Sequence, residues 1–216
     1  MEYDKYDETI AEWYEKVVEA GYHTQQTYIN DLISIIPKRS SILEIGCGTG
    51  LISIPLARAG MQIEGLDKSQ EMLKKLSTKT PHIEIYNVDI RNFTPSKHYD
   101  YILSCNGIFQ IKGRELDSYL LEEEEVIGCL QRYSAMSKNG ILINKGEEKN
   151  DVALALKEKE FRHWELRNKD FVISIHALYG DSLEGVKKHI KRRYPLERIV
   201  SQVKQTRDFE RFILFK

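Results

Sequence analysis

Hydrophobic positions along the chain fall into two alternating patterns. Short segments that carry apolar residues between turn signals, as strands do, occupy residues 41–45, 62–67, 83–89, 99–104 and 141–144. Longer segments with apolar residues at helical spacing occupy residues 24–36, 51–57, 69–75 and 120–136. Because strands alternate with helices, the pattern predicts an α/β fold with a doubly wound, mostly parallel sheet and helices on both of its faces.

The two ends of the chain add elements around this sheet. Before it, an apolar stripe predicts a further helix at residues 7–19, so that the chain begins with an N-terminal helical lid. After it, turn residues between two apolar runs predict an inserted antiparallel hairpin, at residues 160–167 and 171–178. The remaining segments are predicted as a helix and a closing pair of strands, at residues 181–193, 198–207 and 208–216.

A glycine-rich turn joins the strand at residues 41–45 to the helix that follows it. Its glycines are Gly46, Gly48 and Gly50, and this spacing lets the backbone turn sharply and lets a ligand lie against main-chain N–H groups. Glu44, at the end of the strand, is poorly placed for a pyrophosphate, which prefers a helix N-terminus without a nearby carboxylate. It suits a ligand that carries a positive charge. The alternative is a tight strand–helix turn that binds nothing.

The same turn departs from the dinucleotide-binding pattern and resembles another one. A dinucleotide site reads Gly-x-Gly-x-x-Gly, whereas Leu51 stands here where the third glycine would be. The sequence Glu44-x-Gly-x-Gly-x-Gly50 resembles the first motif of class I, Rossmann-like S-adenosylmethionine-dependent methyltransferases, of the small-molecule N- or O-methyltransferase type. The resemblance implies a seven-stranded Rossmann-like sheet and S-adenosylmethionine as cofactor, whose ammonium and sulfonium groups suit an acidic neighbour.

Two further strand ends carry acids that match the same family. Asp67 follows the glycine turn by about twenty residues, where an acid accepts hydrogen bonds from a ribose diol. Residues 65–73 resemble the second motif of small-molecule methyltransferases, in which the region of Met72 packs toward adenine. In the family, an acid at the position of Asp89 accepts from the adenine amino group, and the backbone at the position of Ile90 meets the ring. As an alternative, each acid caps the turn or helix that follows it.

The resemblance is close over residues 40–145 and implies a cofactor site beyond the carboxyl ends of the strands. The residues implied to contact the cofactor are Glu44, Gly46, Cys47, Gly48, Gly50, Asp67, Lys68, Met72, Asp89, Ile90 and Asn106. Asn106 is followed by Gly-Ile-Phe, without the prolines of the Asn-Pro-Pro-Tyr-like motif of DNA-base and glutamine methylases. This departure argues against those two classes of methyl acceptor.

Candidates for catalysis lie outside the central strands. A hydroxyl nucleophile usually needs a general base, whereas an amine of lowered pKa needs none. His176, on the predicted hairpin, is a candidate for that base, and a structural histidine is the alternative. Residues 6–14 resemble the leading helix of small-molecule methyltransferases, in which a tyrosine at the position of Tyr14 reaches toward the cofactor; Tyr14 belongs to the core in the alternative interpretation.

Nothing in the sequence divides the chain, so its 216 residues are expected to form a single methyltransferase domain. Within it we expect a helical lid, a cofactor-binding core, a substrate cap and closing strands, at residues 1–38, 39–150, 151–195 and 196–216. The formal net charge of −1 provides no overall field that would attract nucleic acid or a membrane. Three scattered cysteines and six histidines show neither a disulfide framework nor metal-ligand spacing, so no metal is expected.

The N-terminus is polar and no apolar run is long enough to span a bilayer, which predicts a soluble, cytoplasmic protein. We expect a small-molecule substrate, no nucleic acid and no membrane as partners, and leave open whether the protein is a monomer or a homodimer. Two alternatives stay open: a protein or RNA methyltransferase, and a catalytically inactive regulatory subunit that binds S-adenosylmethionine.

Overall fold

A computed structural model describes Ala11, Tyr14, Glu15 and residues 25–105, 123–144, 206–208 and 212–215. Its helices are α2 (Gln25–Ile35), α3 (Ser53–Arg58), α4 (Gln70–Lys79) and α5 (Glu123–Ala135). Its strands are β1 (Ser41–Ile45), β2 (Gln62–Asp67), β3 (Glu84–Asn87), β4 (Tyr101–Ser104), β5 (Ile141–Asn144), β6 (Thr206–Asp208) and β7 (Phe212–Phe215). None of the helices in this part of the chain combines the length and the apolar character needed to cross a membrane.

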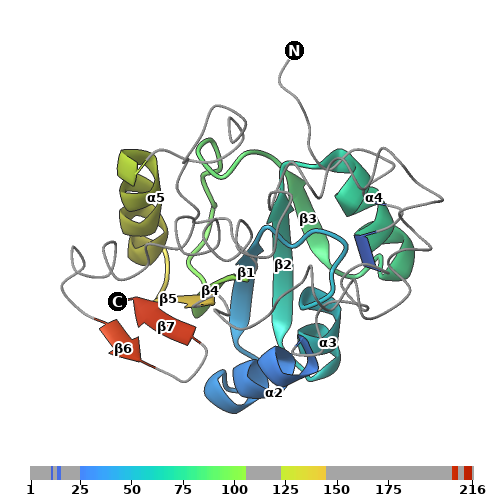
Figure 1. Cartoon of the computed structure of the whole chain (residues 1–216), viewed down its shortest axis with the longest axis horizontal. Coiled ribbons are helices and arrows are strands. Elements are labelled where there is room, and N and C mark those ends of the chain that lie inside the picture. Colours follow the sequence, from blue (N-terminus) through green and yellow to red (C-terminus); the bar gives the residue numbers. More distant parts are fainter. Residues whose placement is uncertain are drawn as a thin grey trace, which may run out of the picture.

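The strands form one sheet in the order β3-β2-β1-β4-β5-β7-β6 (Figure 1). Strands β1 to β5 run parallel to their neighbours, whereas β7 runs antiparallel to β5 and β6 antiparallel to β7. The five parallel strands confirm the predicted Rossmann-like α/β fold. The strand order reverses between β1 and β4, and open α/β sheets bind ligands beyond the carboxyl ends of the strands at such a point.

Some predicted elements lie outside the described residues. These are the hairpin and helix at residues 160–178 and 181–193, the larger part of the first helix at residues 7–19, and the start of the strand at residues 198–207. Strands β1, β2 and β5 begin and end where the sequence predicts. Strands β3 and β4 are shorter than predicted, because Asp89 enters a turn with Arg91 and because Tyr99 pairs with the segment after α5.

Two apolar layers cover the two faces of the sheet. Side chains alternate between the faces along a strand, so Ile42 of β1 packs with α2, α3 and α4, whereas Leu43 and Ile45 pack with α5. Figure 1 shows α5 separated from those three helices by the strands. The alternation also places Glu44 on the face of Ile42, against the first turn of α3. Ser69 caps α4, since its hydroxyl accepts a hydrogen bond from the N–H of Met72 at 3.3 Å.

A polar cluster surrounds the buried Glu64 of β2. The Glu64 carboxylate forms an ion pair with Lys97 and accepts hydrogen bonds from the hydroxyls of Tyr99 at 2.6 Å and Tyr86 at 3.0 Å. Burial alone would raise the pKa of Glu64, but these donors outweigh it and hold the pKa below its ordinary value. Glu64 is therefore ionised and linked to the segment that leads into β4.

Replacing Glu64 with glutamine is expected to lower the free energy of unfolding by about 2 kcal/mol at neutral pH, since it removes the buried charge that Lys97 and the tyrosines satisfy. A group whose pKa is lowered by folding stabilises above its unfolded pKa and loses that contribution as the pH falls through its folded pKa. Urea unfolding should therefore show a smaller difference between wild type and Glu64→Gln at about pH 3 than at pH 7. Glu71→Gln, in an exposed ion pair with Lys74, serves as the control; equal losses in both variants would contradict the prediction.

Candidate functional site

The glycine-rich turn after β1 adopts a backbone that favours glycine. The φ angles of Gly46, Gly48 and Gly50 are 73°, 52° and 84°, in the left-handed region. The N–H groups of Gly46 and Cys47 both donate to the carbonyl of Leu66, at 2.6 and 3.2 Å. The turn is therefore attached to the carboxyl end of β2, the strand that neighbours β1.

Two of these glycines have different surroundings. A Cβ on Gly50 would lie 2.3 Å from Cδ1 of Leu76 in α4, so Gly50 is needed for packing. A Cβ on Gly48 would have no atom of the described residues within 4 Å, so within this part of the chain its backbone faces open space that a ligand can approach. Next to it, the hydroxyl of Thr49 is buried and has no hydrogen-bond partner among the described residues. Open space beside main-chain amides and an unsatisfied buried hydroxyl fit a polar ligand.

Asp67, at the carboxyl end of β2, is oriented by two main-chain amides. Its Oδ2 accepts from the N–H of Gly48 at 2.9 Å, and its Oδ1 accepts from the N–H of Ser69 at 2.8 Å. Asn87, at the end of β3, donates to the carbonyls of Asp67 and Lys68 at 3.2 and 2.9 Å, which fixes the same turn from the other side. Each carboxylate oxygen has two lone pairs, so the partly exposed Asp67 retains acceptor capacity toward a diol.

Glu44 is almost completely buried and does not face a ligand directly. It is 2% exposed, and its carboxyl group accepts a hydrogen bond from the hydroxyl of Ser53, the first residue of α3. Burial raises the pKa of Glu44 to about 8, the Ser53 hydrogen bond opposes that rise, and the charge of Asp67 adds to it. Glu44 is therefore largely protonated at neutral pH, and a positive charge placed beside it would lower its pKa.

Cys47 contributes to the site through its backbone, because its side chain is buried beneath the turn. Burial, reinforced by Glu44 and Asp67, raises the pKa of its thiol far above the ordinary value, so the thiol is not a nucleophile. A Cβ on Gly65 of β2 would lie 2.7 Å from the Cys47 sulfur. Gly65 had no role of its own in the predicted site, although a glycine inside a strand often marks such a close approach.

Asp89 begins a tight turn after β3. Arg91 holds its carboxylate with a two-pronged contact, Nε to Oδ1 and Nη2 to Oδ2, both at 2.8 Å, and the Arg91 N–H also donates to Oδ1 at 2.8 Å. These hydrogen bonds lower the pKa of Asp89 in spite of its partial burial, and the charge of Lys68 lowers it further. Asp89 is therefore ionised and acts only as an acceptor.

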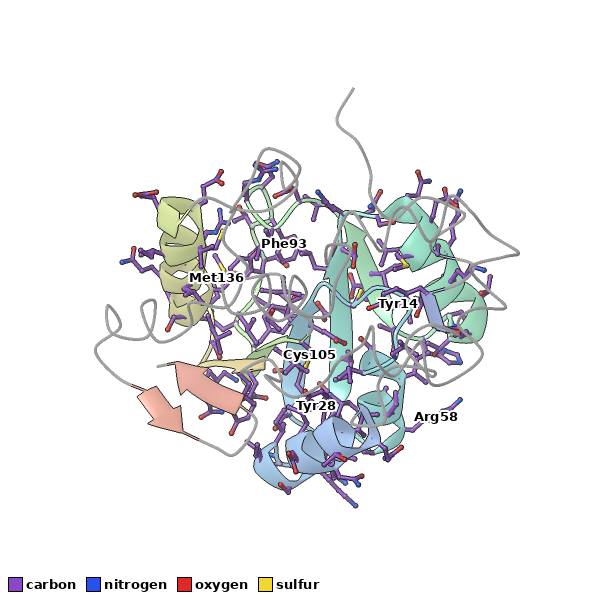
Figure 2. All side chains as sticks on the ribbon, viewed as in Figure 1. Tyr14, Tyr28, Arg58, Phe93, Cys105 and Met136 are labelled. Atoms are coloured by element: carbon purple, nitrogen blue, oxygen red, sulfur yellow. The ribbon has the colours of Figure 1, made fainter. Side chains whose placement is uncertain are left out.

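The structure brings together most of the residues that the sequence singled out. Glu44 lies near the end of β1, and the turn with Gly46, Cys47, Gly48 and Gly50 follows that strand. Asp67 ends β2, Lys68 follows it, and Met72 is buried in α4. Asp89 and the buried Ile90 follow β3. Asn106 and His176 lie outside the described residues. The partly buried Tyr14 lies beside α4 in Figure 2, and the neighbouring Glu15 forms an ion pair with Lys79 at the end of α4.

Several residues of the site were missed by the sequence analysis. Ser53 follows Glu44 by nine positions, and its contact depends on the orientation of α3. Arg91 lies two residues after Asp89, and this short spacing between an arginine and an acid could have indicated their contact. Arg132 donates to the carbonyls of Ile90 and Arg91 from α5, across 41 or more positions, and no local signal predicts such a contact.

Comparison with known proteins agrees with this geometry. Residues 42–127 match a family model described as a methyltransferase domain. The chain is 28% identical to a proposed methyltransferase of Geobacillus, over 63% of this chain and 55% of that relative. It is 26% identical to an uncharacterized methyltransferase of Alkaliphilus oremlandii, over 86% of this chain and 89% of that relative. It is 28% identical to a dTDP-3-amino-3,6-dideoxy-alpha-D-glucopyranose N,N-dimethyltransferase of Streptomyces fradiae, over 60% of the chain and 49% of that enzyme.

Among solved structures, a proposed S-adenosyl-L-methionine-dependent methyltransferase of Methanococcus maripaludis superposes with a TM-score of 0.61 at 17% identity, over 100% of this chain and 96% of that one. The chain thus spans about half of the Geobacillus and Streptomyces relatives and most of the other two. Residues 42–127 are thus similar to methyltransferase domains, and the fold is that of a Rossmann-like S-adenosylmethionine-dependent methyltransferase.

Proposed function

We propose that this protein transfers a methyl group from S-adenosylmethionine to a nitrogen or oxygen nucleophile of a small molecule. The observation that carries the proposal is the position of three acids at or just after the carboxyl ends of neighbouring parallel strands: Glu44 in β1, Asp67 in β2 beside the open backbone of Gly48, and Asp89 after β3. The cofactor has one matching donor for each acid: an ammonium group, a ribose diol and an adenine amine.

In this proposal each part of the site has one task. The open side of the Gly48 backbone and the hydroxyl of Thr49 face the amino-acid portion of the cofactor, and Glu44 supports its positive charge from behind the turn. Asp67 accepts from the ribose hydroxyls, and Asp89 with the backbone of Ile90 reads the edge of the adenine ring. Met72 and Lys68 border the adenosine, and Asn106 contributes from the end of β4.

The cofactor supplies a methyl group on a positively charged sulfur, which a nucleophile takes by in-line displacement. The task of the chain is to align the acceptor and to exclude water, because holding two reactants in line removes much of the entropic cost of their encounter. A hydroxyl acceptor would need a base, for which His176 and Tyr14 are the proposed residues, whereas an uncharged amine would need none.

Small-molecule acceptors are supported by two observations. The Streptomyces fradiae relative is named for the methylation of an amino sugar nucleotide. In addition, Gly-Ile-Phe after Asn106 lacks the prolines found in methylases of DNA bases and glutamine. We propose that residues 1–38 form a lid, residues 39–150 the cofactor core, residues 151–195 a cap over the acceptor, and residues 196–216 the closing strands of one cytoplasmic domain.

The test is transfer of a labelled methyl group from S-adenosylmethionine into a cell lysate that has been separated by size. We expect label in the small-molecule fraction with wild-type protein and none with Asp67→Ala. Label in protein or RNA alone would show a macromolecular acceptor instead, and tight cofactor binding without label in any fraction would indicate an inactive regulatory subunit.

Binding of the cofactor product S-adenosylhomocysteine is expected to release a proton through Glu44. Its pKa of about 8 keeps Glu44 protonated below that pH, and a bound ammonium group would lower the pKa and favour the carboxylate. Affinity should therefore rise with pH, by up to about tenfold per unit below pH 8. Calorimetric enthalpies in phosphate and in Tris, which differ in ionisation enthalpy, should differ for wild type.

The matched variant is Glu44→Gln, which keeps the shape and a hydrogen bond with Ser53 but cannot titrate. It should lose this dependence on buffer, while any proton released by the ligand itself would be seen equally in both proteins. Identical enthalpies in the two buffers for wild type would contradict a charge change at Glu44.

A further inference from the structure

Two neighbouring residues of α5 form hydrogen bonds with the turn after β3. Arg132 donates from Nη2 to the carbonyl of Ile90 at 2.6 Å and from Nη1 to the carbonyl of Arg91 at 2.7 Å. The hydroxyl of Tyr133 donates to the same carbonyl of Ile90 at 2.9 Å. Three hydrogen bonds from one helix therefore converge on two consecutive peptide carbonyls.

Both donors are themselves fixed by packing. Tyr133 is 0% exposed and belongs to the apolar layer that contains Phe93 and Val126. The guanidinium of Arg132 lies over the ring of Tyr133, with its carbon 5.2 Å from the ring centre, and its Nε is buried without a hydrogen-bond partner among the described residues. If this guanidinium moved away from the two carbonyls, it would lose both of its hydrogen bonds to them and leave more of its N–H groups without an acceptor.

The held carbonyls fix the part of the turn that carries Asp89. The Asn92 N–H donates to the carbonyl of Asp89 at 2.9 Å, and because the peptide is planar and trans this also sets the direction of the Ile90 N–H. The backbone and side chain of Arg91, whose carbonyl Arg132 holds, fix both oxygens of the Asp89 carboxylate. A continuous set of contacts thus runs from α5 to the acceptor of Asp89 and the donor of Ile90.

We propose that Arg132 and Tyr133 are positioning residues that set the cofactor's base specificity, by holding the Asp89 carboxylate and the Ile90 N–H at the spacing of the adenine edge. This inference rests on the proposed function, in which Asp89 and Ile90 read adenine. Neither α5 residue touches the cofactor; each acts through the backbone of Ile90 and Arg91.

Adenine and hypoxanthine provide the chemical contrast. Adenine offers an amine donor and a ring-nitrogen acceptor, which pair with a carboxylate and an N–H. Hypoxanthine reverses both groups, so its carbonyl would face Asp89 and its ring N–H would face the N–H of Ile90. A site that is held rigidly rejects such a reversed pattern strongly, because its buried polar groups are left unpaired, whereas a loosened turn can move aside.

The experiment compares the dissociation constants of S-adenosylhomocysteine and S-inosylhomocysteine for full-length proteins. Wild type is expected to prefer the adenine compound by about 100-fold or more. Arg132→Met keeps the side-chain stem and removes the donors, and Tyr133→Phe removes one hydroxyl. We expect the preference to fall about threefold in Tyr133→Phe and about tenfold in the double variant. Lys138→Met, whose ion pair is with Asp100 before β4, is the control and should keep the wild-type preference.

A merely structural role would lower the melting temperature and weaken both ligands by the same factor, so an unchanged preference in folded variants would overturn the inference. Tyr133→Phe alone decides the question if the double variant does not fold. If the wild-type protein binds neither compound, the proposed function itself is refuted. If the wild-type protein prefers the adenine compound and the α5 variants keep the same preference, only the role of Arg132 and Tyr133 is refuted.

Discussion

Replacing Asp67 with alanine is expected to weaken binding of S-adenosylhomocysteine by about 100-fold or more while the protein stays folded. The carboxylate would accept hydrogen bonds from the ribose, and hydrogen bonds to a charged group contribute about 1.5–3 kcal/mol each. Its loss also frees the N–H groups of Gly48 and Ser69, which it now orients at 2.9 and 2.8 Å. Isothermal titration calorimetry measures the change in the dissociation constant.

The control for this variant is Asp100→Ala. Asp100 also accepts from a main-chain amide, that of Ser41 at 2.8 Å. It precedes β4, however, and so lies at the amino-terminal ends of the parallel strands, away from the carboxyl ends where Asp67 lies. Both variants lose comparable hydrogen bonds to the backbone, and only Asp67→Ala should lose affinity. Equal affinities in the two variants would remove Asp67 from the site.

Alanine at Gly50 is expected to lower mainly the stability of the protein, and alanine at Gly48 is expected to weaken mainly the binding of the cofactor. Gly50→Ala should lower the free energy of unfolding by about 2–4 kcal/mol, because its Cβ would clash with Leu76 and its φ of 84° is unfavourable for alanine. Among the described residues, the added methyl group of Gly48→Ala meets no atom within 4 Å, so this variant should cost about 1 kcal/mol, from backbone strain alone. Because its methyl group fills the open space, it should weaken cofactor binding by more than about tenfold.

Urea unfolding and calorimetric titration on the same preparations separate the two effects. Gly60 has a φ of 97°, and no atom of the part of the chain that the structure describes lies within 4 Å of an added Cβ, so Gly60→Ala reports the cost of backbone strain outside the site. If Gly48→Ala bound S-adenosylhomocysteine as tightly as Gly60→Ala does, the space at Gly48 would not be where the ligand lies.

The central strands could be predicted from the sequence because short segments with apolar residues alternate with longer segments that have helical spacing, which is the pattern of a parallel sheet. Strands β1, β2 and β5 have the predicted bounds, and Ser69 caps α4. The ends of β3 and β4 were wrong by one to two residues. There, Asp89 turns the chain through its own side chain, and Tyr99 pairs with the segment after α5, a contact between residues distant in sequence.

The acids of the site could also be located from the sequence, but their surroundings could not. The pattern places Glu44 at the end of β1, whereas its burial against Ser53 depends on which face of the sheet its side chain takes and on where α3 begins. In the same way, Asp89 follows from its strand, whereas the contacts that Arg132 and Tyr133 make with its turn arise only when α5 packs on the sheet.

Calorimetric titration of the wild-type protein with S-adenosylhomocysteine tests the proposed function most directly. The three acids beside the open turn predict a single site with a micromolar dissociation constant in a protein that unfolds cooperatively. An absence of binding up to millimolar ligand, in protein shown to be folded by a cooperative melt, would contradict it.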